Sequence, residues 1–214
     1  MHRRADILSS RVRCFLAVPL AEPALADAQR VLTMLHREIE PVRWARPETL
    51  HITVQFYANA DDDQVRTALR AANTVVAKTK PFPVTLDTLG AFPPRGSPRV
   101  LWLGSTQESP QLVGFAVQCR AALRDAGLEV DDRQFRVHCT LGRPRVRWSS
   151  AVRHHWLDVV RGYRTESTFT ADQLVLFEST SAEGGAIYTP RATLMFSQPA
   201  EIADALPRSS LVER

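Results

Sequence analysis

Two short stretches of the sequence share one pattern: residues 50–56 read L-H-I-T-V-Q-F, and residues 137–143 read V-H-C-T-L-G-R. Each stretch holds a histidine and a threonine one residue apart inside an apolar run: His51 with Thr53, and His138 with Thr140. In an extended strand, residues two apart point to the same face. Each stretch therefore predicts a strand with an apolar face for the core and a second face that carries an imidazole and a hydroxyl.

The same alternation assigns the neighbouring side chains. It places Gln55 on the polar face of the first strand and Phe56 on its core face. A twisted strand end would instead present Phe56 as a platform for a nucleobase, and the sequence leaves both interpretations open. Cys139 falls on the face opposite His138, so we expect a buried apolar residue there and not a nucleophile.

If the two strands meet, two imidazoles and two hydroxyls share one cleft. Two histidines can serve as general base and general acid, because an unperturbed imidazole has a pKa of about 6.5. The hydroxyls of Thr53 and Thr140 can donate hydrogen bonds to phosphate oxygens. This equipment suits attack on a phosphodiester, and we expect no metal and no cofactor. The competing interpretation is that both motifs are half-exposed strand residues bonded to the backbone.

Strand and helix patterns alternate around the two motifs. We expect strands at 11–19, 83–90, 99–104, 173–179 and 192–197, and helices between Pro23 and Pro41, from 61–63 onward, from Ser109 to Leu123 and at 149–161. A unit of strand, helix and H-x-T strand occurs twice, which indicates an internal duplication in topology. The pattern predicts an α+β protein with mostly antiparallel pairing.

Composition narrows the class of protein. The 214 residues fit one domain, which we place at 1–197, followed by a C-terminal tail at 198–214. No apolar run approaches the roughly 20 residues of a membrane span, and the three cysteines form no C-x-x-C pair. The net charge of +4 is compatible with a polyanionic ligand without requiring one. We expect a monomer in the cytoplasm, with no membrane contact.

The sequence resembles the 2H phosphoesterase superfamily, and within it the RNA 2′,3′-cyclic phosphodiesterases, also called 2′-5′ RNA ligases. The resemblance covers nearly the whole chain and is carried by R-C-F-L-A-V-P-L (13–20), V-R-W-A-R-P-E-T-L-H-I-T-V-Q-F (42–56), F-P-P-R-G-S-P-R-V-L-W-L-G (92–104), F-R-V-H-C-T-L-G-R-P (135–144) and L-V-L-F-E-S-T…G-A-I-Y (174–180 and 185–188). It implies a bilobal, duplicated fold with two mostly antiparallel sheets and outer helices around a central cleft. One departure is that Val137 and Cys139 stand where proline and a larger aliphatic residue are frequent.

The resemblance also implies an activity, the opening of a terminal RNA 2′,3′-cyclic phosphate to a 2′-phosphomonoester, with 2′-5′ ligation as the secondary reverse reaction. His51 would protonate the departing 3′ oxygen and His138 would activate water, while Thr53 and Thr140 would hold phosphate oxygens. Arg143 matches the arginine of the family's T-L-x-R, where a guanidinium can pair with phosphate or stack on a base. A solvated charge at a strand end is the alternative for Arg143.

Two other functions stay open: the same chemistry on a small cyclic nucleotide, and an RNA-binding module without turnover. Nucleotide-binding glycine motifs and H-E-x-x-H are absent from the sequence, so other common catalytic frameworks are not indicated. The placement of arginines discriminates between RNA and a small molecule, because an RNA path needs them along the cleft. The relevant residues are Arg43, Arg46, Arg95, Arg99, Arg143, Arg145 and Arg147.

Overall fold

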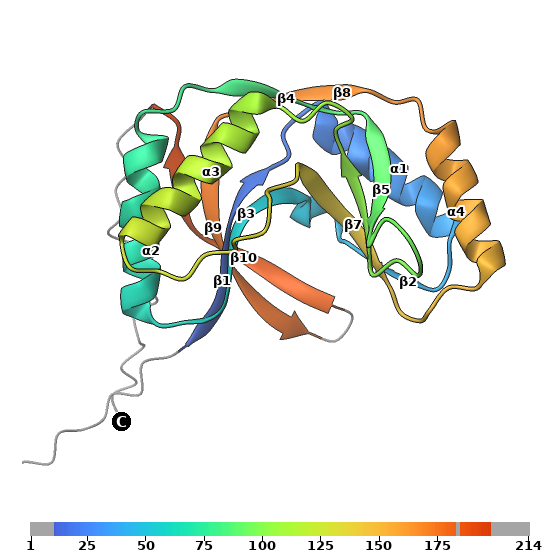
Figure 1. Cartoon of the computed structure of the whole chain (residues 1–214), viewed down its shortest axis with the longest axis horizontal. Coiled ribbons are helices and arrows are strands. Elements are labelled where there is room, and N and C mark those ends of the chain that lie inside the picture. The colour runs from blue at the N-terminus through green and yellow to red at the C-terminus, as the bar shows by residue number, and fades with distance from the viewer. Residues whose placement is uncertain (1–10, 183–184, 198–214) are drawn as a thin grey trace, which may run out of the picture.

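A computed structural model of the chain describes residues 11–182 and 185–197, so the predicted tail at 198–214 lies outside the described part. The elements, most of them labelled in Figure 1, are β1 (Val12–Pro19), α1 (Ala24–Glu38), β2 (Val42–Trp44), the short 3-10 helix η1 (Pro47–Thr49), β3 (His51–Ala60), α2 (Asp62–Val76), β4 (Phe82–Leu86), β5 (Thr88–Phe92), β6 (Val100–Gly104), α3 (Pro110–Asp125), β7 (His138–Pro144), α4 (Ser150–Gly162), β8 (Ser167–Ala171), β9 (Gln173–Ala182) and β10 (Gly185–Met195). Every strand pair in this described part is antiparallel. The α+β class is thus confirmed.

The order of the strands reveals the duplication. One sheet runs β10-β9-β1-β3-β7-β6-β5, with β2 paired to β7, and β4 pairs with β8 in a second, two-stranded sheet. The central run β9-β1-β3-β7-β6-β5 is symmetric about its middle. In this symmetry β3 corresponds to β7, β1 to β6 and β9 to β5. The strands β4 and β8 are matched in the same way. The predicted duplication is confirmed in topology, with an approximate two-fold axis between β3 and β7.

The two halves of the large sheet meet at a single residue pair. Ile52 of β3 lies opposite Cys139 of β7, and the two strands pair nowhere else. The family resemblance implied two mostly antiparallel sheets around a central cleft, and the structure has one large sheet and one two-stranded sheet. The two lobes share the large sheet across this one junction. The strands β3 and β7 diverge on both sides of the pair formed by Ile52 and Cys139. Since the strands are antiparallel, each motif histidine lies toward the threonine of the other strand.

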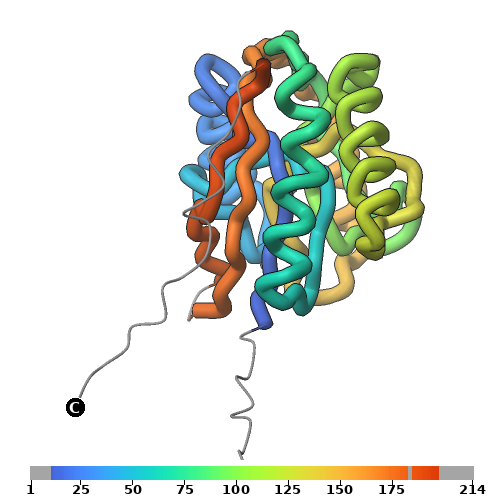
Figure 2. The backbone as a smooth tube through the Cα atoms, turned by 90° about the vertical axis from the view of Figure 1, so that its left-hand side faces the viewer, coloured from blue at the N-terminus to red at the C-terminus, as the bar shows by residue number. Residues whose placement is uncertain are grey.

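Each lobe receives one helix from each half of the sequence. The helices α2 and α3 pack together, α2 contacts β9 and β10, and α3 contacts β3 and β4. Figure 2 shows these two helices running side by side. The helices α1 and α4 lie on the other side of the molecule, where α1 contacts β2 and α4 contacts β5. Among the described helices, none has the length and apolar character that a membrane crossing requires.

The predicted helix starts are confirmed by their caps. The carboxylate of Asp61 accepts from the backbone N–H of Gln64 at 2.9 Å, and the Gln64 side chain accepts from the Asp61 N–H at 2.9 Å. The Ser109 hydroxyl oxygen likewise accepts from the N–H of Leu112 at 3.3 Å, ahead of Pro110 in the first turn. These contacts satisfy backbone donors that an uncapped helix leaves without a partner.

The strand predicted at 83–90 is two strands in different sheets. The chain passes from β4 to β5 at Asp87, whose backbone N–H donates to the Gly104 carbonyl at 2.8 Å. The Asp87 carboxylate accepts from the backbone N–H of Thr106 at 2.6 Å and from its hydroxyl. This anchor turns the chain without glycine or proline at residue 87, so the sequence carries no break signal there. The strands β2 and β8 were also not predicted.

Candidate active site

The first motif strand contains a β-bulge directly after its threonine. Thr53 lies opposite Ala17 and Gln55 lies opposite Leu16, so Val54 has no counterpart in β1. An extra residue of this kind turns the following side chains to the other face of the strand. Gln55 is consequently buried, at 3% exposure, and Phe56 is 39% exposed. Strict alternation therefore assigned both residues to the wrong face.

The second motif strand has the same bulge at the equivalent position. Thr140 lies opposite Trp102 and Gly142 lies opposite Leu101, which leaves Leu141 without a counterpart in β6. The exposed side chain of Arg143 follows. Phe56 and Arg143 are thus equivalent, each the fifth residue after a motif histidine. Both bulges return that fifth residue to the face that carries the histidine.

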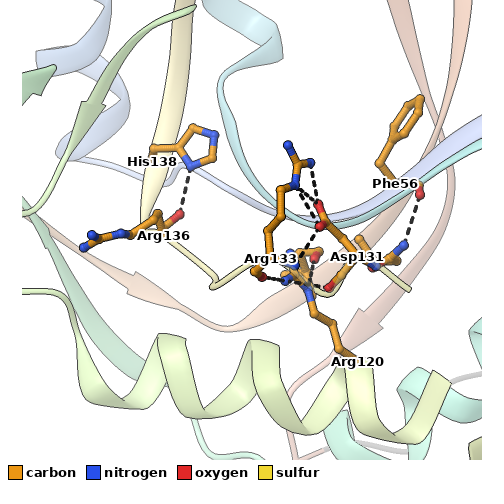
Figure 3. A network of polar contacts seen from close by, with 8 residues as sticks. Phe56, Arg120, Asp131, Arg133, Arg136 and His138 are labelled. Atoms are coloured by element: carbon orange, nitrogen blue, oxygen red, sulfur yellow. Dashed lines mark hydrogen bonds and ion pairs between the residues drawn. The ribbon is translucent and has the colours of Figure 1, made fainter. Parts of the chain in front are cut away.

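A network of hydrogen bonds braces the first bulge (Figure 3). Arg120 of α3 donates from Nε to the Val54 carbonyl at 3.0 Å, and from Nη1 to the carbonyls of Arg133 at 2.8 Å and Asp131 at 3.1 Å. The Asp131 N–H donates to the side-chain oxygen of Gln55 at 3.1 Å. Arg120 therefore connects the bulge before Phe56 to the segment that leads to the second histidine. In the second strand, the Leu141 carbonyl accepts from the Ala45 N–H at 2.7 Å.

Arg120→Met is expected to lower the free energy of unfolding by about 1–3 kcal/mol, because it leaves partly buried carbonyls without their charged donor. Urea unfolding measures this change, and Arg124→Met is the matched control. Arg124 lies in the same helix, but its ion pair with Asp132 is exposed at the surface, so its loss should cost about 0–1 kcal/mol. Equal costs for the two variants would contradict the bracing role.

One pocket of about 160 Å³ opens beside the motif strands. The predicted site residues that line it are His51, Thr53, Phe56, Thr140 and Arg143. His138 does not line the pocket itself. The pairing of Ile52 with Cys139 nevertheless places His138 on the same face as His51, in the adjacent strand. The structure thus brings both motifs to one place, as the pattern predicts.

His51 is held by its Nδ1 atom and by aromatic rings. Nδ1 lies 2.6 Å from the carbonyl oxygen of Thr49, and the ring stacks on Phe15 with centroids 4.6 Å apart. A carbonyl can only accept, so Nδ1 carries the proton and Nε2 of the neutral ring is the basic nitrogen. Burial lowers the pKa of His51 to about 4, against the opposing effect of the Thr49 hydrogen bond. The expectation of a pKa near 6.5 is wrong for this residue.

His138 has the same arrangement in the other half of the site. Its Nδ1 lies 2.8 Å from the Arg136 carbonyl oxygen, again two residues earlier in the chain, and Phe92 packs edge-on at 5.1 Å. Burial lowers the pKa of His138, and the charges of Arg143 and Arg133 lower it further. Both histidines do bond to the backbone, as the competing interpretation holds. They do so through Nδ1, and no described residue bonds to either Nε2.

The neighbours of the motif residues behave as alternation predicts. Cys139 and Val137 are buried. Burial raises the pKa of the Cys139 thiol to about 12, which keeps it protonated and unreactive near neutral pH. The departures at positions 137 and 139 therefore lie away from the pocket, in the core.

The candidate arginines divide into two groups. Arg43, Arg46 and Arg143 line the pocket. Arg95 lines a separate apolar groove beside α4, and the remaining three are absent from the pocket lining: Arg99, Arg145 and Arg147.

Sequence reasoning missed several lining residues, among them Arg13, Phe15 and Tyr188. Arg13 lies over the Phe56 ring at 4.6 Å, and Tyr188 packs edge-on against His51 at 5.4 Å. In the sequence, Arg13 and Phe15 lie at the start of the stretch R-C-F-L-A-V-P-L, and Tyr188 ends the stretch G-A-I-Y. Both stretches belong to the family resemblance and could have pointed to these residues. Among the residues that the structure describes, none that lines the pocket carries a carboxylate, and no group of three potential metal ligands is found.

The chain is similar in sequence to known phosphoesterases. The family described as LigT like Phosphoesterase matches residues 20–102. The RNA 2′,3′-cyclic phosphodiesterase of Archaeoglobus fulgidus is 29% identical over 156 residues, which are 73% of this chain and 83% of that protein. Its counterpart from Aquifex aeolicus is 28% identical over 151 residues, 69% and 78% of the two chains.

Solved structures show the same fold. The crystal structure of E. coli LigT complexed with 3′-AMP aligns with a TM-score of 0.69 at 21% identity, over 88% of this chain and 99% of that one. The crystal structure of TT0787 of Thermus thermophilus aligns with a TM-score of 0.70 at 21% identity, over 86% and 98% of the two chains.

Proposed function

We propose that the chain, which is similar to LigT-like phosphoesterases over residues 20–102 and to RNA 2′,3′-cyclic phosphodiesterases over most of its length, hydrolyses a terminal 2′,3′-cyclic phosphate of RNA to a 2′-phosphomonoester without a metal ion. One observation carries the proposal: two neighbouring imidazoles each have Nδ1 fixed on a carbonyl, beside a pocket lined by two threonines and several arginines. Each ring thus keeps Nε2 for proton transfer with substrate or water. The relatives' names support RNA as the substrate.

In the proposed reaction, His138 Nε2 takes a proton from water as the water oxygen bonds to phosphorus. The bond from phosphorus to the 3′ oxygen breaks, and Nε2 of protonated His51 gives its proton to that oxygen. The hydroxyls of Thr53 and Thr140 donate to the non-bridging oxygens, and Arg143 stabilises their negative charge. The assignment of acid and base follows the family resemblance. Ligation would run the same steps backward, with a 5′ hydroxyl in place of water.

The lowered pKa of His51 gives a pH prediction. An acid must hold its proton, so a free-protein pKa of about 4 means that kcat/KM falls with rising pH from well below 6.5. A bound phosphate anion favours imidazolium and raises this pKa in the complex. The alkaline limb of kcat should therefore lie at higher pH than that of kcat/KM. Rates from about pH 4 to about pH 9 measure both limbs, and coincident limbs would refute the role of bound phosphate.

The first test uses a short RNA ending in a 2′,3′-cyclic phosphate, incubated with the protein in excess EDTA. The expected product is a 2′-phosphate end, formed despite the chelator and lost in His51→Ala. Opening of 2′,3′-cyclic mononucleotides without turnover of the oligomer would favour the small-molecule function. No turnover of either would favour an RNA-binding module. The monomeric state, the cytoplasmic location and the domain boundary at 197 stay predictions.

A further inference from the structure

The pocket has a cluster of like charges at its rim, made of Arg13 from β1, Arg43 from β2 and Arg143 from β7. Arg43 lies directly opposite Arg143 in the pairing of β2 with β7. Burial lowers the pKa of Arg143, and the charges of Arg43 and Arg13 lower it further, so each of these two guanidiniums acts on Arg143. Like charges opposite each other destabilise a sheet unless something compensates them.

The described residues provide no acidic partner for this cluster. Elsewhere in the fold arginines are paired, as Arg191 is with Glu178 and Arg133 is with Asp131. Within residues 11–182 and 185–197, no ion pair involves the arginines of the pocket and no lining residue carries a carboxylate. A concentration of unpaired guanidiniums beside a catalytic pocket favours an anionic ligand.

The cyclic phosphate alone does not account for this cluster. In the proposed reaction that phosphate lies between the motif histidines and threonines. Arg143 is three residues beyond Thr140, with the bulge between them, and Arg43 lies opposite Arg143 in β2, so both residues are displaced along β7 from the motif residues. The pocket volume of about 160 Å³ is also below the roughly 300–1,000 Å³ of sites that enclose a whole small ligand. The rest of the substrate must therefore extend over the rim, where Arg13 and Arg43 are exposed.

We propose that Arg13 and Arg43 form a subsite for a second phosphate, the one on the 5′ side of the terminal nucleoside, next to Arg143, which the proposed reaction assigns to the cyclic phosphate. The inference rests on the proposed function and names its substrate class as a polynucleotide end. Phe56, with Arg13 over its ring, lies in the same pocket and offers a stacking surface for the terminal base. Arg43 is then a residue that distinguishes RNA ends from cyclic mononucleotides.

The experiment compares adenosine 2′,3′-cyclic phosphate with the same nucleotide carrying a 5′-phosphate. The native protein should open the 5′-phosphorylated substrate with a kcat/KM about tenfold higher, as expected for a charge-assisted phosphate contact. Arg43→Gln should remove most of that preference, and Arg13→Gln should reduce it. Arg95→Gln is the matched control, since Arg95 is exposed but lines the separate groove. It should keep the preference in full.

Salt dependence gives a second readout. For the 5′-phosphorylated substrate, the slope of log kcat/KM against log salt concentration should be shallower by about one in Arg43→Gln than in Arg95→Gln. Equal turnover of both substrates by the native protein, or a preference that survives both Arg43→Gln and Arg13→Gln, would overturn the subsite while leaving the proposed function intact. Failure to open either mononucleotide, together with failure to open the RNA oligomer of the first test, would overturn the proposed function, and the subsite with it.

Discussion

Replacing His51 or His138 by alanine is expected to lower kcat/KM on a cyclic phosphate end by about 10²- to 10⁴-fold in each case. Each ring presents Nε2 for one of the two proton transfers, because its Nδ1 is occupied by the carbonyl of Thr49 or Arg136. Steady-state rates on an RNA with a 2′,3′-cyclic phosphate end measure the loss. The kcat/KM of the double variant should be only slightly lower than that of the less active single variant, because both groups act in one step of the proposed reaction.

His154→Ala is the matched control for these variants. The Nδ1 of His154 also lies 2.8 Å from a backbone carbonyl oxygen, that of Ser150, but the residue is exposed on α4 and does not line the catalytic pocket. It should retain the native rate. A His138→Ala variant with more than about a tenth of the native rate would contradict the role of that ring as general base.

Ile52→Ala is expected to cost about 2–5 kcal/mol in the free energy of unfolding. The side chain is 0% exposed, and its residue forms the one pair that joins β3 to β7. Ile52→Val removes a single methylene and should cost about 0.5–1.5 kcal/mol. Urea unfolding of both variants measures the difference. Equal costs would show that the junction repacks around the smaller side chain.

The position of Ile52 at the junction also predicts a loss of activity, which the burial of its side chain alone would not predict. Ile52 lies between His51 and Thr53, so a cavity there loosens the spacing of the two motifs. Leu16→Ala is the comparison, because Leu16 is equally buried but belongs to β1. Under conditions where both variants are folded, kcat/KM should fall further in Ile52→Ala. A larger loss in Leu16→Ala would contradict this positioning effect.

Features that depend on local pattern could be predicted from the sequence. Alternation located the strands that carry His51 and His138, the residues Asp61 and Ser109 gave the helix starts, and the repeated unit gave the symmetric topology. Each of these depends on neighbours along the chain, which the sequence displays directly.

Features that depend on distant partners could not be predicted in this way. The bulge at Val54 has no glycine to mark it and is braced by Arg120, 66 residues later. The low pKa of His51 comes from burial, with Phe15 of another strand stacked on its ring. The cluster of Arg13, Arg43 and Arg143 forms only when β1, β2 and β7 join one sheet. The periodicity of apolar residues and the secondary-structure propensity of single residues contain no information on these contacts.

The bulges at Val54 and Leu141 divide each motif strand into two parts. The first part carries the histidine and the threonine, and the second carries the fifth residue after the histidine. The histidine and threonine before the bulge are the same in both strands, whereas the fifth position holds an aromatic ring in one and a guanidinium in the other. Substitution of Phe56 or Arg143 is therefore expected to leave the histidine and threonine of each strand in place. The number of residues between the threonine and the fifth position matters more, because it decides which face the fifth side chain occupies. One deletion there would rotate the recognition side chain into the core and leave the histidine and threonine in place.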